Sequence, residues 1–121
     1  MSNDETKFDL EERTAKFGED VINFVKTIHL NEINRPLISQ LIRSATSVGA
    51  NYCEADCAET KKDFEHKLGI CRKESKETKH WLRMMATAQP DLKENLRSIW
   101  KESNELNLIF SSIIRKSRNK L

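Results

Sequence analysis

Apolar positions recur in steps of three and four residues along four stretches of the chain. These stretches cover residues 9–30, 34–59 and 61–88, and a last one that runs from residue 91 into a basic tail. Steps of three and four residues are the spacing of one face of an α-helix. The connections are short, and short connections make consecutive helices antiparallel neighbours. The sequence therefore predicts an all-α fold, a single-domain antiparallel up-down-up-down four-helix bundle over residues 1–121, with residues 1–8 and 118–121 flexible.

Capping residues mark where each helix is expected to begin. The expected caps are Asp9 with Glu12, Asn34 before Pro36, Thr60, and Asp91 with Glu94. Each supplies a side-chain oxygen for the free N–H groups of a first helical turn. Gly49 lies inside the second stretch, where glycine is unfavourable for a helix, and predicts a close approach of a neighbouring helix.

A stripe of polar residues runs along the second stretch. Its members are Gln40, Arg43, Ser47, Asn51 and Glu54, in steps of three, four, four and three residues. The third stretch carries Glu74 and Glu77 among apolar neighbours. Because charged groups at the edge of a core need partners, we expect a structural polar layer in which Arg43 pairs with one of these carboxylates and Asn51 bridges what remains.

The third stretch has the clearest periodicity. Its apolar seam is Phe64, Leu68, Cys71, Ser75, Thr78, Leu82 and Met85. Its opposite face is mostly basic and is expected to point outward. This face, the start of the stretch and the C-terminal tail provide the candidate phosphate-binding residues. They are Lys61, Lys62, Arg72, Lys73, Lys76, Lys79, Arg83, Arg115, Lys116 and Arg118.

The charge is unevenly divided along the chain. Residues 1–60 hold six Lys and Arg against eleven Asp and Glu, a formal charge of −5, whereas residues 61–121 hold fifteen against eight, a charge of +7. A basic half attracts polyanions, and contacts to phosphate alone would bind RNA or DNA without reading its sequence. The alternative is that acidic and basic faces of neighbouring subunits pair with each other.

Composition limits the remaining classes of protein. The 121 residues contain three glycines and two prolines, and a third are charged, which disfavours a turn-rich β fold. No long apolar run predicts a transmembrane helix, and the N-terminal residues lack the apolar stretch of a signal peptide. We expect a cytoplasmic protein, and the three cysteines (Cys53, Cys57 and Cys71) are expected to be free, partly buried thiols.

The sequence carries no catalytic or metal-binding signature. A di-iron bundle needs Glu-x-x-His on two helices, but the one match, Glu77 to His80, shares its helix with the imperfect match Asp63 to His66. Ser44 and Ser47 lack a histidine nearby. We expect no enzyme activity, no metal and no cofactor. Two tryptophans (Trp81 and Trp100) suggest a stacking platform for single-stranded nucleic acid, although their place in or beside apolar seams favours packing in the core or at a subunit interface.

The motifs of the second and third stretches occur together in a known family. They are the run from Gln40 to Asn51, then Glu54-Ala55, Asp63-Phe64, Lys67-Leu68, Lys73-Glu74, Glu77-Thr78 and Trp81-Leu82. This combination resembles a bacterial family of small four-helix-bundle proteins, whose members include proteins encoded within intervening sequences of 23S ribosomal RNA genes. The resemblance covers most of the chain and is weakest in residues 1–8 and in the last helix.

The resemblance implies a bundle that assembles as a ring-like homopentamer, in a family that has no established enzymatic activity and whose members mostly have no known function. The chain is also similar to the accessory protein of diversity-generating retroelements, which is basic, pentameric and works with a reverse transcriptase and nucleic acid. This chain departs from that protein in its acidic first helix. We expect a homopentamer that binds RNA or DNA backbone, with no membrane or small-molecule partner. The alternative is a protein-interaction scaffold without nucleic-acid affinity.

Overall fold

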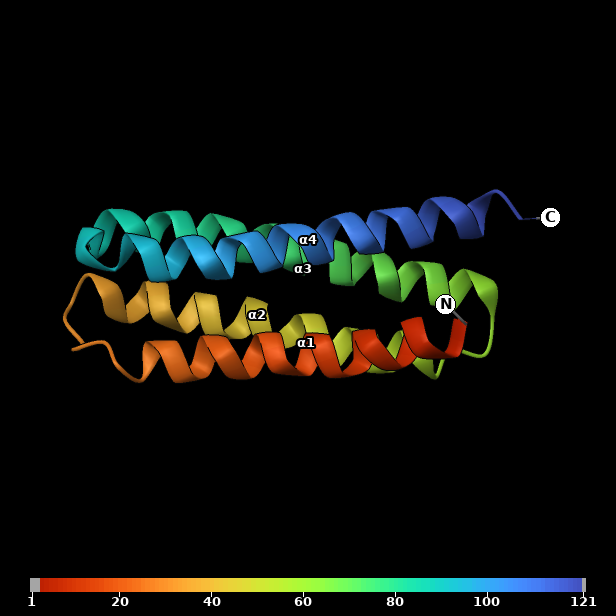
Figure 1. The fold of residues 1–121 in the computed structure, drawn as a ribbon, viewed down its shortest axis with the longest axis horizontal. Helices are drawn as coiled ribbons and strands as arrows, with labels where there is room; N and C mark the ends of the chain where they lie inside the picture. Colours follow the sequence, from red (N-terminus) through yellow and green to blue (C-terminus); the bar gives the residue numbers. More distant parts are fainter. Residues whose placement is uncertain (1–2, 121) are drawn as a thin grey trace.

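Four helices form an antiparallel up-down-up-down bundle in the computed structural model (Figure 1). The structure describes the backbone of residues 3–120 and the side chains of residues 9–120. The helices are α1 (Asn3–Val25), α2 (Asn34–Asp56), α3 (Lys61–Ala88) and α4 (Lys93–Arg118), with a 3-10 helix, η1 (Pro90–Leu92), between the last two. These residues contain no strand, and the predicted fold class is confirmed. The flexibility of residues 1–8 and 118–121 stays a prediction, and residues 1, 2 and 121 lie outside the described residues.

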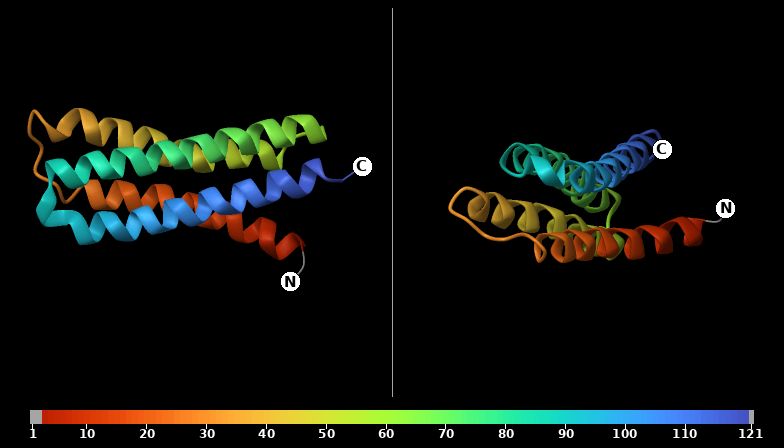
Figure 2. Two further views of the ribbon diagram at one scale, coloured as in Figure 1. Left: turned by 90° about the horizontal axis from the view of Figure 1, so that it is seen from above. Right: turned by 60° about the vertical axis from the view of Figure 1, so that its left-hand side comes forward.

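The bundle consists of two stacked hairpins, α1–α2 and α3–α4 (Figure 1). The interface between α2 and α3 is the most extensive, whereas α1 and α4 meet over a short region. Figure 2 shows α1 diverging from the other helices toward its N-terminus. Where α1 and α4 do meet, Arg13 Nε and Nη2 each donate to a different oxygen of the Glu102 carboxylate at 2.8 Å, which gives the contact a fixed, bidentate geometry.

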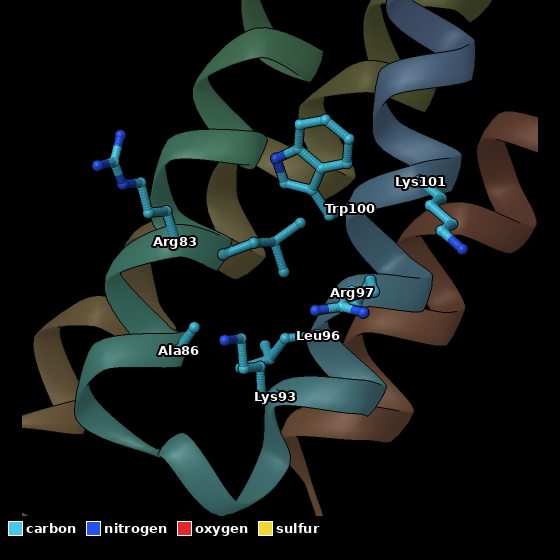
Figure 3. A pocket seen from close by; sticks show the side chains of 8 residues that line it. Arg83, Ala86, Lys93, Leu96, Arg97, Trp100 and Lys101 are labelled. Atoms are coloured by element: carbon cyan, nitrogen blue, oxygen red, sulfur yellow. The ribbon is translucent and has the colours of Figure 1, made fainter.

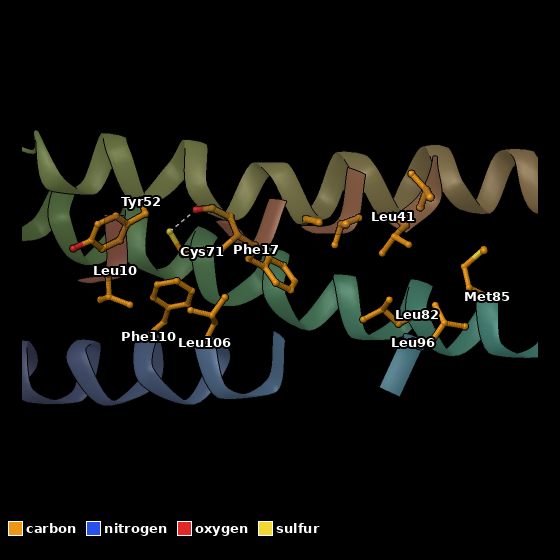
Figure 4. Packing of buried hydrophobic residues seen from close by; sticks show 14 of the residues in the cluster. Leu10, Phe17, Leu41, Tyr52, Cys71, Leu82, Met85, Leu96, Leu106 and Phe110 are labelled. Atoms are coloured by element: carbon orange, nitrogen blue, oxygen red, sulfur yellow. Dashed lines mark hydrogen bonds between the residues drawn. The ribbon is translucent and has the colours of Figure 1, made fainter. Parts of the chain in front are cut away.

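The apolar seams predicted from the sequence form the core (Figure 4). On α3 the seam is buried from Leu68 to Met85, and Phe64 at its start is half-buried. On α4 the core takes Ile114, which is 2% exposed, and the half-buried Ile113 packs against it. Burial of these side chains is the main source of the stability of the fold.

Both ends of α1, the cap of α2 and the end of α2, at Asp56 rather than near residue 59, differ from the predicted ones. Helix α1 begins at Asn3, so Asp9 lies within it, and it ends at Val25 rather than near Leu30. Asn34 does not cap α2, because its buried amide accepts from Asn31 N–H and donates to the His29 carbonyl and to Gln89 Oε1. The capping contacts come from Asn31 instead, whose Oδ1 accepts from the N–H groups of residues 33 and 34.

The cap expected for α3 is present, whereas the cap expected for α4 is not. Thr60 Oγ1 accepts from Asp63 N–H at 3.0 Å, which confirms the cap of α3. Neither η1 nor α4 receives a hydrogen bond from a capping side chain, so the predicted role of Asp91 is wrong. The chain enters α4 through the 3-10 turn of η1, where Leu92 N–H donates to the Gln89 carbonyl.

Small residues set the closest helix contacts. A Cβ atom at Gly49 would lie 3.3 Å from the Thr14 carbonyl oxygen of α1, which confirms the expected close approach. Between α2 and α3, Thr78 Oγ1 lies 2.9 Å from Ser44 Oγ, and both residues are fully buried. Between α3 and α4, Ser103 Oγ donates to the Ser75 carbonyl. Small hydroxyl side chains therefore let the backbones approach while their own polar atoms stay hydrogen-bonded.

Candidate nucleic-acid interface

An ion-pair cluster joins the two central helices beside the basic face of α3. Arg43 of α2 contacts two carboxylates of α3: Nη1 lies 3.2 Å from Glu74 Oε2 and Nη2 lies 2.8 Å from Glu77 Oε1. The pairing expected between the second and third helices is therefore present. The three side chains differ in exposure, at 48% for Arg43, 10% for Glu74 and 32% for Glu77. The cluster thus holds one nearly buried carboxylate against a guanidinium that reaches solvent.

The two carboxylates of the cluster have pKa values that move in opposite directions. Burial raises the pKa of Glu74 above its ordinary value, and a hydrogen bond with Glu77 adds to this, although the charge of Arg43 opposes it. The hydrogen bond with Arg43 lowers the pKa of Glu77. A buried carboxyl whose pKa is raised and a paired carboxyl whose pKa is lowered therefore share the guanidinium of Arg43.

The other members of the predicted polar layer make separate contacts. Gln40 Oε1 accepts from Arg43 Nε at 3.2 Å, and Glu54 pairs with Lys67 at 3.3 Å. Asn51 does not bridge α2 and α3, because its amide donates to the Ser47 carbonyl one turn earlier in the same helix. The layer is therefore a cluster around Arg43 with a separate ion pair further along α2.

The basic residues of α3 divide into exposed and packed ones. Lys73, Lys76 and Arg83 are exposed, and Arg72 is half-buried. Lys79, which was expected to face outward, is half-buried against α4, where Nζ donates to Asn104 Oδ1 at 2.9 Å. The same Nζ lies 5.3 Å from the centre of the Trp100 ring, within range of a cation–π contact.

The start of α3 and the end of α4 form a second basic area at one end of the bundle (Figure 1). Lys61 Nζ donates to the Lys120 carbonyl at 2.6 Å, and Ser117 Oγ donates to Glu65 Oε2 at 2.5 Å. These contacts join two groups of cations that are far apart in sequence. The exposed members are Lys61, Lys62, Arg115, Lys116 and Arg118.

The candidate cations differ in their partners from several other cations of the bundle. Arg13, for example, is held by the carboxylates of Glu102 and Glu105, although Lys26 and Arg35 have no such ion pair within residues 9–120. Within residues 9–120, by contrast, no carboxylate pairs with the exposed candidates Lys62, Lys73, Lys76, Arg83, Arg115, Lys116 and Arg118. Their charge is therefore uncompensated on the molecule itself and acts on solutes outside it.

A further basic group on α4 was missed in the sequence. Lys93, Arg97 and Lys101 follow each other at four-residue spacing, so they share one face of α4, and all three are exposed. This face adjoins Arg83 of α3 around a pocket of about 380 Å³ (Figure 3). The spacing was visible in the sequence, but its position beside α3 depends on the rotation of α4 about its own axis.

The cysteines and the other potential metal ligands of the described residues do not form a cluster. Within the described residues, no three His, Cys, Asp or Glu side chains gather closely enough to hold a metal. Cys53 and Cys57 are exposed rather than partly buried, and Cys71 is buried. Burial raises the pKa of the Cys71 thiol to about 12, so it stays protonated, and its Sγ donates to the Val48 carbonyl at 3.6 Å (Figure 4).

Comparison with known proteins identifies the family. The model of the 23S rRNA-intervening sequence proteins matches residues 6–112. The chain belongs to this family. A solved structure of a protein of unknown function from the S23 ribosomal protein family of Bacteroides thetaiotaomicron is 30% identical, with a TM-score of 0.79 over 90% of this chain and 97% of that one. No curated protein matches the chain.

The family match and the structural match agree with the resemblance drawn from the sequence motifs. The matched residues include all of α2 and α3, where those motifs lie, and most of α4. Within residues 3–120, none of the helices combines the length and the apolar character that crossing a lipid bilayer requires.

Proposed function

We propose that this member of the 23S rRNA-intervening sequence protein family is a non-enzymatic homopentamer that binds the backbone of RNA or DNA without sequence preference. It would act as an accessory protein or as a protein associated with rRNA insertions. The observation that carries the proposal is the set of exposed cations on α3 and α4 that lack carboxylate partners within the described residues. Cations that no internal partner neutralises can each displace counterions from phosphate.

Self-association has its own support. Ile22 on α1 is 39% exposed and Leu108 on α4 is 61% exposed. Exposed apolar side chains on two separate helices provide contact surfaces for neighbouring subunits. An acidic α1 and a basic α3–α4 hairpin also suit head-to-tail packing, which closes into a ring when the rotation between subunits allows it. Light scattering on the purified protein measures the number of subunits directly.

Charge reversal tests the binding surface. Lys73, Lys76 and Arg83, each changed to Glu, should abolish retention on an RNA or DNA filter at low salt. The matched control changes three exposed cations on the other hairpin, Lys16, Lys26 and Arg35, to Glu. Both variants have the same net charge, so loss in the first and retention in the second locates binding on α3. Absence of wild-type retention at low salt overturns the proposal.

A scaffold function is the second candidate, and the acidic residues of α1 favour it. Glu11, Glu12, Glu19 and Asp20 are exposed, and they could pair with the basic face of a neighbouring subunit. In that case rising salt loosens the oligomer, and no nucleic acid is retained at any salt concentration. Backbone binding instead predicts an oligomer that survives at salt concentrations where nucleic acid is released.

A further inference from the structure

A pocket between α3 and α4 combines an apolar floor, an exposed indole ring and a rim of cations (Figure 3). Leu82, Ala86 and Leu96 form the floor, and Leu82 and Leu96 are at most 2% exposed. Trp100 lines the pocket and is 40% exposed. The volume of about 380 Å³ falls in the range of about 300–1,000 Å³ that is typical of small-ligand sites.

The cations around this pocket point in two directions. Figure 3 shows Lys93 and Arg97 reaching toward the space between the helices, while Arg83 and Lys101 point outward on either side. The acidic residue that contacts this rim is Glu94, whose Oε1 lies 3.9 Å from Arg97 Nη1, with both side chains largely exposed. An exposed pair at that distance is weak, so Arg97 remains available to an anion.

We propose that the pocket takes an unpaired nucleobase of single-stranded RNA or DNA, which stacks on Trp100 while the adjoining phosphates contact the cations. The inference rests on the proposed function and names the form of nucleic acid that the protein prefers. Stacking on an aromatic side chain tolerates every base, in keeping with binding that does not read sequence. Arg83 and Lys101 flank the pocket on either side, where the phosphates next to a bound base would lie.

The shape of the pocket favours this ligand over two others. A base in a duplex is stacked on both faces and paired, so it cannot enter a recess between helices without being extruded. A lipid surface is contacted by apolar side chains that project from a helix, whereas Leu82, Ala86 and Leu96 form the floor of a recess. Lys79, at 5.3 Å from the Trp100 ring centre, holds the indole in place from α3.

The test compares labelled single-stranded and duplex oligonucleotides of the same sequence by fluorescence anisotropy at fixed low salt. Wild type should bind the single strand more tightly. Trp100→Ala should weaken single-strand binding about tenfold, within the range expected for one stacked base, and should leave duplex binding unchanged. Trp100→Phe should restore most of the affinity because it keeps an aromatic face. Ile33→Ala, which removes an exposed apolar side chain just before α2, is the matched control and should have no effect.

The outcomes separate this inference from the function on which it rests. If wild type binds duplex and single strand equally, and Trp100→Ala changes neither, the pocket assignment is wrong while backbone binding stands. If wild type binds neither form, both proposals are overturned. Binding to vesicles of anionic phospholipid that depends on Trp100, without a Trp100 effect on single strands, would replace the nucleobase with a lipid. Circular dichroism of each variant confirms that the helices are retained.

Discussion

The guanidinium of Arg43 on α2 lies 2.8 Å from the carboxylate of Glu77 on α3 and also contacts Glu74, which is nearly buried. This contact joins the two central helices beside the exposed lysines of α3. Lys73 and Lys76 line the same surface depression as the three charged residues of the cluster. The cluster therefore connects the stability of the bundle to the position of its basic face.

Arg43→Met should destabilise the protein most at neutral pH. Without Arg43, the buried Glu74 carboxylate loses its countercharge. Glu77 loses the hydrogen bond with Arg43 that lowers its pKa. The expected loss at pH 7 is about 1–3 kcal/mol, between the values for exposed and buried pairs, because Arg43 is half-exposed. Urea denaturation of the variant and of wild type measures it.

The pH dependence of this loss has a definite sign. Glu77 has a lowered pKa in wild type, so it contributes stability above its ordinary value of 4.5, which is lost as the pH falls. Glu74 has a raised pKa, so its ionisation costs stability as the pH rises. The difference between Arg43→Met and wild type should therefore shrink below pH 4.5. Adding Glu74→Gln should restore stability at pH 7, and strictly additive losses would show that the two residues do not interact.

Leu82→Ala should cost about 2–5 kcal/mol, because the side chain is 1% exposed and its removal leaves a cavity. Lys79→Ala should cost about 1 kcal/mol, because the residue hydrogen-bonds to Asn104 and lies over Trp100. Lys76→Ala, on the exposed face, should cost almost nothing. If thermal melts show a larger loss of stability for Lys76→Ala than for Lys79→Ala, the packing of α3 against α4 is contradicted.

Gly49 and Gly69 form a matched pair of helical glycines. Gly69→Ala should stabilise the protein by about 0.5–1 kcal/mol, because alanine favours a helix and, among the described residues, no atom of another helix lies within 4 Å of the new Cβ. Gly49→Ala should lack this gain, because its Cβ would lie 3.3 Å from the Thr14 carbonyl oxygen, an atom of the α1 backbone. Equal stabilisation by both changes would mean that α1 is not held against α2 at this point.

The sequence predicted the contacts that follow from helix order and periodicity. Arg43 could be placed near Glu74 because consecutive antiparallel helices must pack, and each residue lies at the edge of an apolar stripe. The same reasoning failed for Asn51, because its amide donates instead to the Ser47 carbonyl oxygen one turn earlier in its own helix. It also failed for Asn34, whose partner Gln89 lies in a different connection of the bundle.

The basic pocket on α4 could not be predicted for a related reason. Spacing alone groups Lys93, Arg97 and Lys101 on one face, but it does not say whether that face adjoins α1, α3 or solvent. Trp100 is 40% exposed, so it does not lie in the core, and its predicted place at a subunit interface stays a prediction. Contacts such as the hydrogen bond from Lys79 to Asn104 show which side of α4 adjoins α3, and periodicity does not encode these contacts.

The salt dependence of nucleic-acid binding tests the central claim most directly. Affinity for a single-stranded oligonucleotide is measured across a series of salt concentrations, for wild type and for the variant with Lys73, Lys76 and Arg83 changed to Ala. If these cations contact phosphates, log K falls linearly with log salt in wild type, and the slope of the variant is shallower by about 2. Wild-type affinity that is absent at low salt, or a slope that the three substitutions leave unchanged, contradicts the account.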